Sequence, residues 1–292
     1  MPRPKFHAAE ATKKGACGTT HYAGLHVRAR PAFRRSGVRI AFALAAALVT
    51  ATLPALGACI ARSGPETAAL VELYTSEGCS SCPPADRWLT SLPERYAPSQ
   101  VVPLALHVDY WDYIGWKDPF AKREFSQRQR RLSQLQRAAL VYTPQVLLQG
   151  ADFPQWGSTA FDNAVARINA RPARAALELQ ISEIRPATLV LRASAAVSGG
   201  TSAADALVYV ATYENRLESR ITAGENRGRV LHHDHVVLEW RGPYGLGTRE
   251  LELALLPKAK SADSGVVAFV QNRRTGEVLQ ALSLAACTAA GF

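Results

Sequence analysis

Apolar residues follow one spacing before about residue 175 and a different spacing after it. The first region alternates short apolar runs with helix-like segments. Strands are predicted at 68–74, 101–108 and 145–148, and helices at 85–96, 119–139 and 158–170. Because a helix joins the first two strands, they should run parallel through a right-handed crossover. The second region carries seven runs of period two, which predict half-buried strands as in a β-sandwich.

The two regions therefore predict two domains. The first, at 66–172, is an α/β domain that contains an inserted helix, and the second, at 175–292, is β-sandwich-like.

The formal net charge is +10, but the first 60 residues hold nine of the 34 Lys and Arg and one of the 24 acids. The remainder, with 25 basic and 23 acidic residues, carries only +2. Nucleic-acid binding needs a basic patch on the folded part, so we do not expect a nucleic-acid partner.

Residues 1–62 have the features of an export leader. Arginines precede an apolar run at 40–58, and small residues follow it, as in a signal peptide. The run ends in LGAC, which resembles the lipobox of bacterial lipoproteins and would make Cys59 a lipidation site. An ordinary cleaved signal and a retained membrane anchor are the alternatives. Each predicts an exported chain, either periplasmic or membrane-anchored and facing the periplasm.

Two of the five cysteines, Cys79 and Cys82, are separated by only two residues between a predicted strand and a predicted helix. A structural zinc site needs a second ligand pair, and the sequence has no other Cys-x-x-Cys motif, so we expect no metal. A structural disulfide is possible, but one that closes so short a loop stabilises little. A redox dithiol is favoured, because a helix N-terminus stabilises the Cys79 thiolate and Cys82 can resolve a mixed disulfide. Since a residue before proline disfavours helix, Pro83 should delay the helix start to Pro84.

The strand, Cys-x-x-Cys and helix, followed by Thr143-Pro144 before a later strand, resemble the thioredoxin fold. That resemblance implies a cis Thr143-Pro144 bond close to the cysteines and a thioredoxin-like α/β domain ahead of the β-sandwich-like one. More narrowly, EGCSSCPPAD (77–86), HVDYWDYIGWKDP (107–119) and VYTPQ (141–145) are similar to the domain-of-unknown-function 1223 family of secreted bacterial proteins. The similarity covers about residues 68–287 and implies no defined activity.

Further side chains are candidates for the same site, with structural roles as the alternative for each. Glu72 could be a buried acid that takes the proton of Cys82. His107 and Asp109 could face the thiols, and Trp111 and Trp116 could line a substrate groove.

The leading hypothesis is an envelope thiol–disulfide oxidoreductase for exported protein thiols or small thiols, with no cofactor. In it Cys79 attacks, Cys82 resolves the mixed disulfide, and Pro144 and Thr143 position the substrate. One rival is a binding module in which Cys79 and Cys82 form a fixed disulfide. Another is copper handling by the dithiol with His107, which the single methionine of the chain disfavours. The sequence does not predict an oligomeric state.

Overall fold

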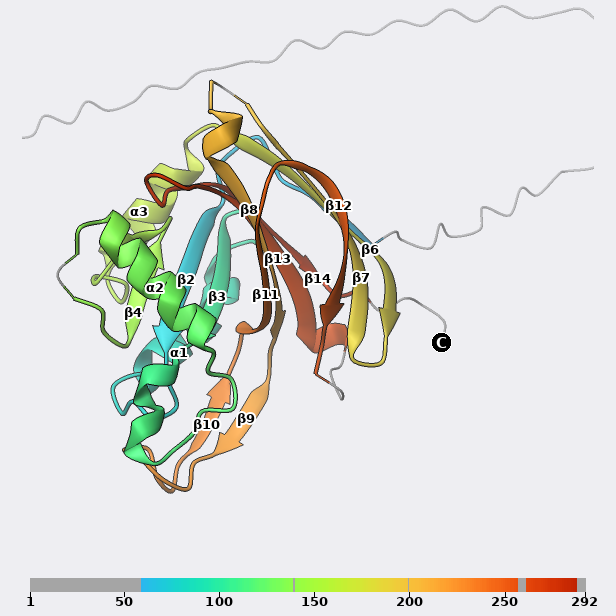
Figure 1. Ribbon diagram of the computed structural model, residues 1–292. Helices are drawn as coiled ribbons and strands as arrows, with labels where there is room; N and C mark the ends of the chain where they lie inside the picture. Colours follow the sequence, from blue (N-terminus) through green and yellow to red (C-terminus); the bar gives the residue numbers. More distant parts are fainter. Residues whose placement is uncertain (1–58, 139, 199, 257–260, 288–292) are drawn as a thin grey trace, which may run out of the picture. The chain divides into compact units, whose positions relative to one another are not determined.

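The computed structural model describes residues 59–138, 140–198, 200–256 and 261–287 (Figure 1). The predicted leader, with its apolar run at 40–58, lies outside the described residues. Among the helices of the described residues, none is long and apolar enough to cross a membrane.

The helices are α1 (Pro83–Arg95), η1 (Asp109–Ile114), α2 (Arg123–Leu135), α3 (Thr159–Asn169), η2 (Ala203–Asp205) and η3 (Ser261–Asp263), where η marks a 3-10 helix. The strands are β1 (Cys59–Arg62), β2 (Ala69–Thr75), β3 (Val101–His107), β4 (Gln145–Leu148), β5 (Ala151–Asp152), β6 (Ala175–Arg185), β7 (Thr188–Val197), β8 (Ala206–Glu214), β9 (Leu217–Arg220), β10 (Val230–His233), β11 (Val236–Tyr244), β12 (Gly247–Ala254), β13 (Ser264–Asn272) and β14 (Val278–Ala285).

Individual elements lie close to where the apolar spacing places them. β2 and β3 are parallel, as the helix between them predicts, and β4 pairs antiparallel with β2. The short ribbon of β9 and β10 is not predicted by the sequence, because its polar residues carry no period-two signal.

The expected fold class, a thioredoxin-like α/β domain followed by a β-sandwich-like domain, is wrong. The chain forms a β-rich fold in which both regions share one eight-stranded sheet, with the order β14-β13-β8-β11-β3-β2-β4-β5. A period-two pattern indicates that a strand is half buried but does not identify its neighbours. β8 and β13 are buried along nearly their whole lengths, as expected for strands inside a large covered sheet. The predicted boundary between two domains near residues 172–175 stays a prediction.

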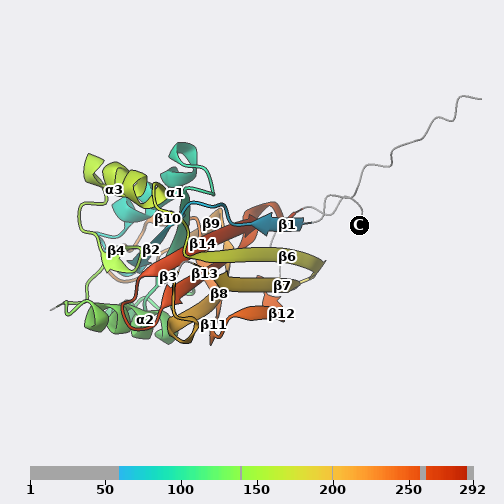
Figure 2. The same ribbon diagram turned by 90° about the horizontal axis from the view of Figure 1, so that it is seen from above.

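Three apolar layers cover the large sheet. On one face Leu70 of β2 packs with Phe125 of α2, and on the other face Leu73 packs with Leu89 of α1 and Phe161 of α3. Figure 2 shows this arrangement, with α1 and α3 above the strands and α2 below them. A second sheet, β1-β6-β7-β12, shares a core with β8, β13 and β14. The chain turns from the carboxyl end of β2 into α1, and Cys79 and Cys82 lie in this turn.

Candidate functional site

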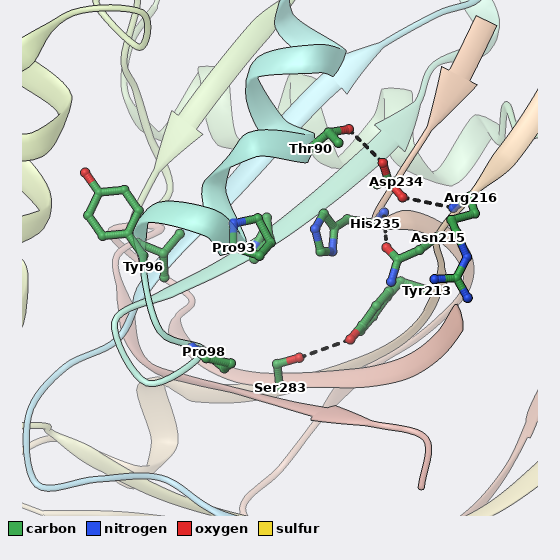
Figure 3. A pocket seen from close by; sticks show the side chains of 12 residues that line it. Thr90, Pro93, Tyr96, Pro98, Tyr213, Asn215, Arg216, Asp234, His235 and Ser283 are labelled. Carbon is green, nitrogen blue, oxygen red and sulfur yellow. Dashed lines mark hydrogen bonds between the residues drawn. The ribbon is translucent and has the colours of Figure 1, made fainter. Parts of the chain in front are cut away.

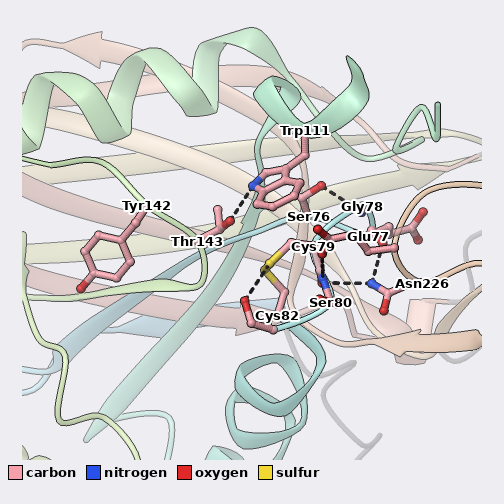
Figure 4. The surroundings of a disulfide bond; sticks show 12 residues. Ser76, Glu77, Gly78, Cys79, Ser80, Cys82, Trp111, Tyr142, Thr143 and Asn226 are labelled. Atoms are coloured by element: carbon pink, nitrogen blue, oxygen red, sulfur yellow. Dashed lines mark hydrogen bonds between the residues drawn. A yellow bond between two sulfur atoms is a disulfide. The ribbon is translucent and has the colours of Figure 1, made fainter. Parts of the chain in front are cut away.

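Cys79 and Cys82 lie where the chain passes from β2 to α1. They are joined by a disulfide, and neither residue has exposed surface (Figure 4). Cys82 has helical φ and ψ of −76° and −39°, and α1 begins at Pro83, so the expected start at Pro84 is wrong. Prolines are tolerated in the first turn because their missing N–H groups would have no partner within the helix.

The 3-10 helix η1 packs against the cysteine loop. A Cβ atom placed on Gly78 would lie 3.2 Å from Ile114 Cδ1 and 3.4 Å from Trp111 Cβ, so a side chain at this position would require the Ile114 side chain to shift by a few tenths of an ångström. Trp111 Nε1 donates a hydrogen bond of 2.6 Å to Thr143 Oγ1. The Thr143-Pro144 bond is cis, as expected. Figure 4 shows Trp111, Thr143 and Tyr142 on one side of the disulfide.

Two buried histidine–acid pairs lie beside this loop. His107 Nδ1 is 2.7 Å from Asp118 Oδ2, and His233 Nε2 is 3.1 Å from Glu77 Oε1. The pairs are connected, because the Glu77 backbone N–H donates to Asp118 Oδ2 over 2.9 Å. Trp116 Nε1 donates to the other Glu77 oxygen, so this bond ties Trp116 to the cluster, and its expected place in a substrate groove stays a prediction. All four members of the two pairs are at most 3% exposed.

Two residues that the sequence analysis missed hold the cysteine loop from the far side. Asn226 Nδ2 donates to the carbonyl oxygens of Glu77 and Cys79, over 2.8 and 2.9 Å. Glu225 Oε2 accepts a hydrogen bond from the Ser80 backbone N–H. Both lie in the turn between β9 and β10, and Asn226 is 147 residues from Cys79. Their side chains give no local signal, since only the tertiary fold brings this turn to the loop.

Opposing effects set the ionisation of the His107–Asp118 pair. Burial disfavours the charged imidazole, but the carboxylates of Asp118, Asp86 and Glu77 raise the pKa of His107. Burial also disfavours the Asp118 carboxylate, but His107 and the backbone N–H groups of Glu77 and Phe120 lower its pKa. The pair is therefore fully ionic between these two pKa values.

Replacing Asp118 with asparagine should destabilise the protein more at about pH 5.5 than at about pH 8.5. A raised His107 pKa stabilises the folded state fully below the unfolded pKa, and this contribution disappears as pH rises through the folded pKa. Urea unfolding of the wild type and of Asp118→Asn at both pH values measures the difference. Glu94→Gln, an exposed change on α1, is the control. Equal losses for Asp118→Asn at the two pH values would show that the pair is not ionic.

Glu72 does not offer a free carboxylate to Cys82, which corrects the role expected for it. Its side chain is buried and paired with Arg128 of α2, with 2.6 Å between Glu72 Oε1 and Arg128 Nε and 3.1 Å in the second contact. Along β2, Glu72 shares the face of Leu70, which packs against α2. The helix that begins after Cys82 covers the opposite face.

Asp109 also lies apart from His107, although the two were expected to face the thiols together. The strand ends at His107, and Asp109 begins η1. Its backbone N–H donates to Ser126 Oγ, and that hydroxyl donates to the Asp109 carboxylate. Asp109 therefore connects η1 to α2, whereas His107 faces the cluster beside the cysteines.

A second disulfide joins Cys59 to Cys287 across 228 positions of sequence. It connects the start of β1 to the segment that follows β14. A lipid thioether would use the same sulfur atom of Cys59, so lipidation there and this disulfide exclude each other.

A separate cavity of about 360 Å³ lies where β11 begins, opposite the middle of β3 (Figure 3). The rings of Tyr96, Tyr213 and His235 contribute to its lining, together with Pro93 of α1. Burial lowers the pKa of His235 to about 4, so its imidazole is neutral at physiological pH. The lining includes neither cysteine of the loop. Within the described ranges, no group of three His, Cys, Asp or Glu side chains is arranged to hold a metal ion.

Comparisons with known proteins agree with this β-rich architecture. A crystal structure of a protein from Agrobacterium tumefaciens is 23% identical, with a TM-score of 0.55, and the match covers 77% of this chain and 97% of that one. HBP35 of Porphyromonas gingivalis is 17% identical, with a TM-score of 0.55 and 76% of each chain covered. At these identities the likeness shows the fold alone.

No curated protein matches the sequence. The family model described as "Protein of unknown function (DUF1223)" matches residues 70–271, which include the cysteine loop, η1 and both histidine–acid pairs. The chain therefore belongs to the DUF1223 family.

Proposed function

We propose that this protein exchanges thiols and disulfides through Cys79 and Cys82. The observation that carries the proposal is the disulfide between two cysteines only three positions apart, at the first turn of α1. A bridge that closes so short a loop adds less stability than one that closes a long loop, so its chemistry is the better reason for its presence. The N-terminal end of a helix also favours a thiolate over a thiol.

In the proposed reaction a substrate thiolate attacks Cys79 Sγ, and Cys82 leaves as a thiolate. A second substrate thiolate then attacks the mixed disulfide and releases Cys79 as a thiolate. In the reverse reaction the Cys79 thiolate attacks a substrate disulfide and one substrate thiolate leaves, and Cys82 then attacks Cys79 Sγ and releases the second substrate thiolate. Ser81 Oγ lies 3.2 Å from Cys79 Sγ, where its hydroxyl can donate to that thiolate. Because Cys79 is fully buried in the disulfide form, a substrate reaches it only after a neighbouring side chain moves.

Trp111 and Thr143 are the side chains that we assign to substrate contact. Both lie beside the disulfide, and Pro144 follows Thr143 at the start of β4. Tyr142, which is 36% exposed, extends this surface with an aromatic ring. An extended polypeptide with a cysteine next to an apolar residue, or a small thiol, would match such a surface.

The proposed location is outside the cytoplasm. The leader-like segment at 1–62 supports export. Two disulfides among the described residues suit an oxidising compartment, since cytosolic thiols are kept reduced. Partners would then be the thiols of other exported proteins, or small thiols of that compartment.

The reduction potential of the Cys79–Cys82 pair tests the proposal. Full-length protein is equilibrated in graded glutathione buffers, and the free thiols are trapped and assigned to each cysteine by peptide mass spectrometry. We expect a potential between about −120 and −270 mV, the range of known exchange catalysts. A potential below about −300 mV would instead assign the pair to a structural bridge. Cys287→Ser is the matched control, because it removes a disulfide without touching the proposed site.

A further inference from the structure

Asp86 is a buried carboxyl on α1, one helical turn after Cys82. Its backbone N–H donates to the Cys82 carbonyl oxygen over 3.1 Å, and residues four apart lie on the same face of a helix. Cys82 is fully buried and Asp86 is only 8% exposed. No ion pair ties the Asp86 carboxyl to a cation among the described residues, unlike the carboxyl of Glu72.

Unpartnered polar atoms surround this carboxyl. Asp86 Oδ1, Thr75 Oγ1 and His107 Nε2 are all buried, and none has a partner in good hydrogen-bond geometry among the described residues, although the Thr75 hydroxyl lies near enough to the Asp86 carboxyl to favour its charged form. Thr75 and His107 are register partners at the ends of β2 and β3, on the face of the sheet that packs against α1. Buried polar atoms without partners are costly, and they are retained where a water molecule or a moving proton uses them.

The charges that face Asp86 come from three other parts of the fold. Burial has the largest effect and raises the pKa of Asp86, while the imidazoles of His233 and His107 act against it. The Thr75 hydroxyl also favours the carboxylate, and Asp118 disfavours it. Asp86 therefore keeps a proton to higher pH than an exposed aspartate does, and His107 limits that increase.

Breaking the disulfide creates a need for this proton. When a thiolate attacks Cys79 Sγ, a new sulfur–sulfur bond forms to Cys79 and the bond between Cys79 and Cys82 breaks. The electron pair of the broken bond goes to Cys82 Sγ, which is buried. A thiolate is unfavourable in a desolvated site unless a proton or a cation neutralises it.

We propose that Asp86 donates this proton to Cys82 Sγ and takes it back when Cys82 attacks in the reverse direction, and that His107 is the positioning residue that sets the pH at which it does so. This inference rests on the exchange chemistry proposed above. No metal or cofactor enters the step, and the only co-reactant is the attacking small thiol. Asp86 occupies the place in the mechanism that the sequence analysis gave to Glu72.

The test is the rate at which dithiothreitol reduces the Cys79–Cys82 disulfide, followed from about pH 5 to about pH 9 by quenched thiol trapping. Each rate is divided by the concentration of dithiothreitol thiolate, so that ionisation of the reductant does not enter. We expect the wild-type rate constant to be steady at low pH and to fall as Asp86 loses its proton. Asp86→Asn should be about 100-fold slower at low pH and show no such fall.

Three further variants separate proton transfer from a structural role. Asp86→Glu should restore part of the rate and the pH-dependent fall. Glu94→Gln removes an exposed carboxyl from the same helix and should match the wild type. His107→Gln removes a group that lowers the Asp86 pKa, so the fall should move to higher pH.

The outcomes distinguish this inference from the proposed function. A wild-type pH profile in Asp86→Asn overturns the proton donor, and an unmoved fall in His107→Gln overturns the positioning role. If the wild-type pair does not exchange with glutathione, the proposed function fails. The dithiothreitol rates still decide the role of Asp86 in that case, because they require only that the disulfide can be reduced.

Discussion

Replacing Arg128 with methionine should lower the free energy of unfolding by about 3–5 kcal/mol, because it leaves the Glu72 carboxylate buried without a cation. Two guanidinium nitrogens contact Glu72, and a third donates to Gln271 Oε1 over 3.1 Å. The guanidinium carbon also lies 4.6 Å from the ring centroid of Trp240 and 5.1 Å from that of Phe269. Burial opposes the charge on Arg128, but Glu72 raises its pKa, so the pair stays ionic.

Urea unfolding at neutral pH measures this loss. Arg131→Met is the matched control, since it makes the same change at an exposed position on α2 and should cost less than about 0.5 kcal/mol. The double variant Glu72→Met/Arg128→Met should recover most of the stability, because it removes both buried charges and keeps apolar volume. If Arg128→Met costs no more than Arg131→Met, the pair does not contribute as its burial implies.

The double variant Cys59→Ser/Cys287→Ser should be less stable than the wild type by about 2–5 kcal/mol. This disulfide closes a loop across 228 positions of sequence, and the entropy that a crosslink removes from the unfolded chain grows with loop length. Within the fold, the stability of β1 should fall most, because β1 pairs with β6 and carries Cys59. Unfolding in urea without reductant measures it.

Cys79→Ser/Cys82→Ser provides the comparison, because it removes a disulfide that spans only three positions. The chain-entropy relation assigns this short loop about 2 kcal/mol, against about 5 kcal/mol for the long one. A greater loss from the short loop than from the long one would argue against the entropic account. It would indicate that the Cys79–Cys82 bridge is structural.

The sequence predicts most individual elements of this fold because apolar spacing is a local property. It does not predict the order of strands in the sheets. β11 lies between β8 and β3, although its pattern contains nothing that specifies β3 as a neighbour. Period two shows which residues of a strand point inward, and the partner strand depends on long-range packing. The apolar pattern is therefore compatible with two separate domains, although strands from both regions share the eight-stranded sheet.

The candidate site, like the fold, is predictable from the sequence only in part. Cys79, Cys82 and the cis Thr143-Pro144 bond are recognisable from a motif and a resemblance. Glu72 was misplaced because alternation along a buried strand does not show which face meets which helix. The role of Asn226 depends on a turn far along the chain reaching the cysteine loop, so no local pattern could have shown it.

The strand order also constrains when the chain can fold during synthesis. β3 ends at His107, but its neighbour β11 begins only at Val236, so the large sheet is incomplete until the chain is nearly finished. Pairing strands this far apart requires closure of a long loop, which makes folding slower than for local contacts. Cys79 and Cys82 are made early and meet each other across two residues, whereas Asn226 arrives late. Their disulfide can therefore form in a nascent chain, before the native sheet exists to bury it.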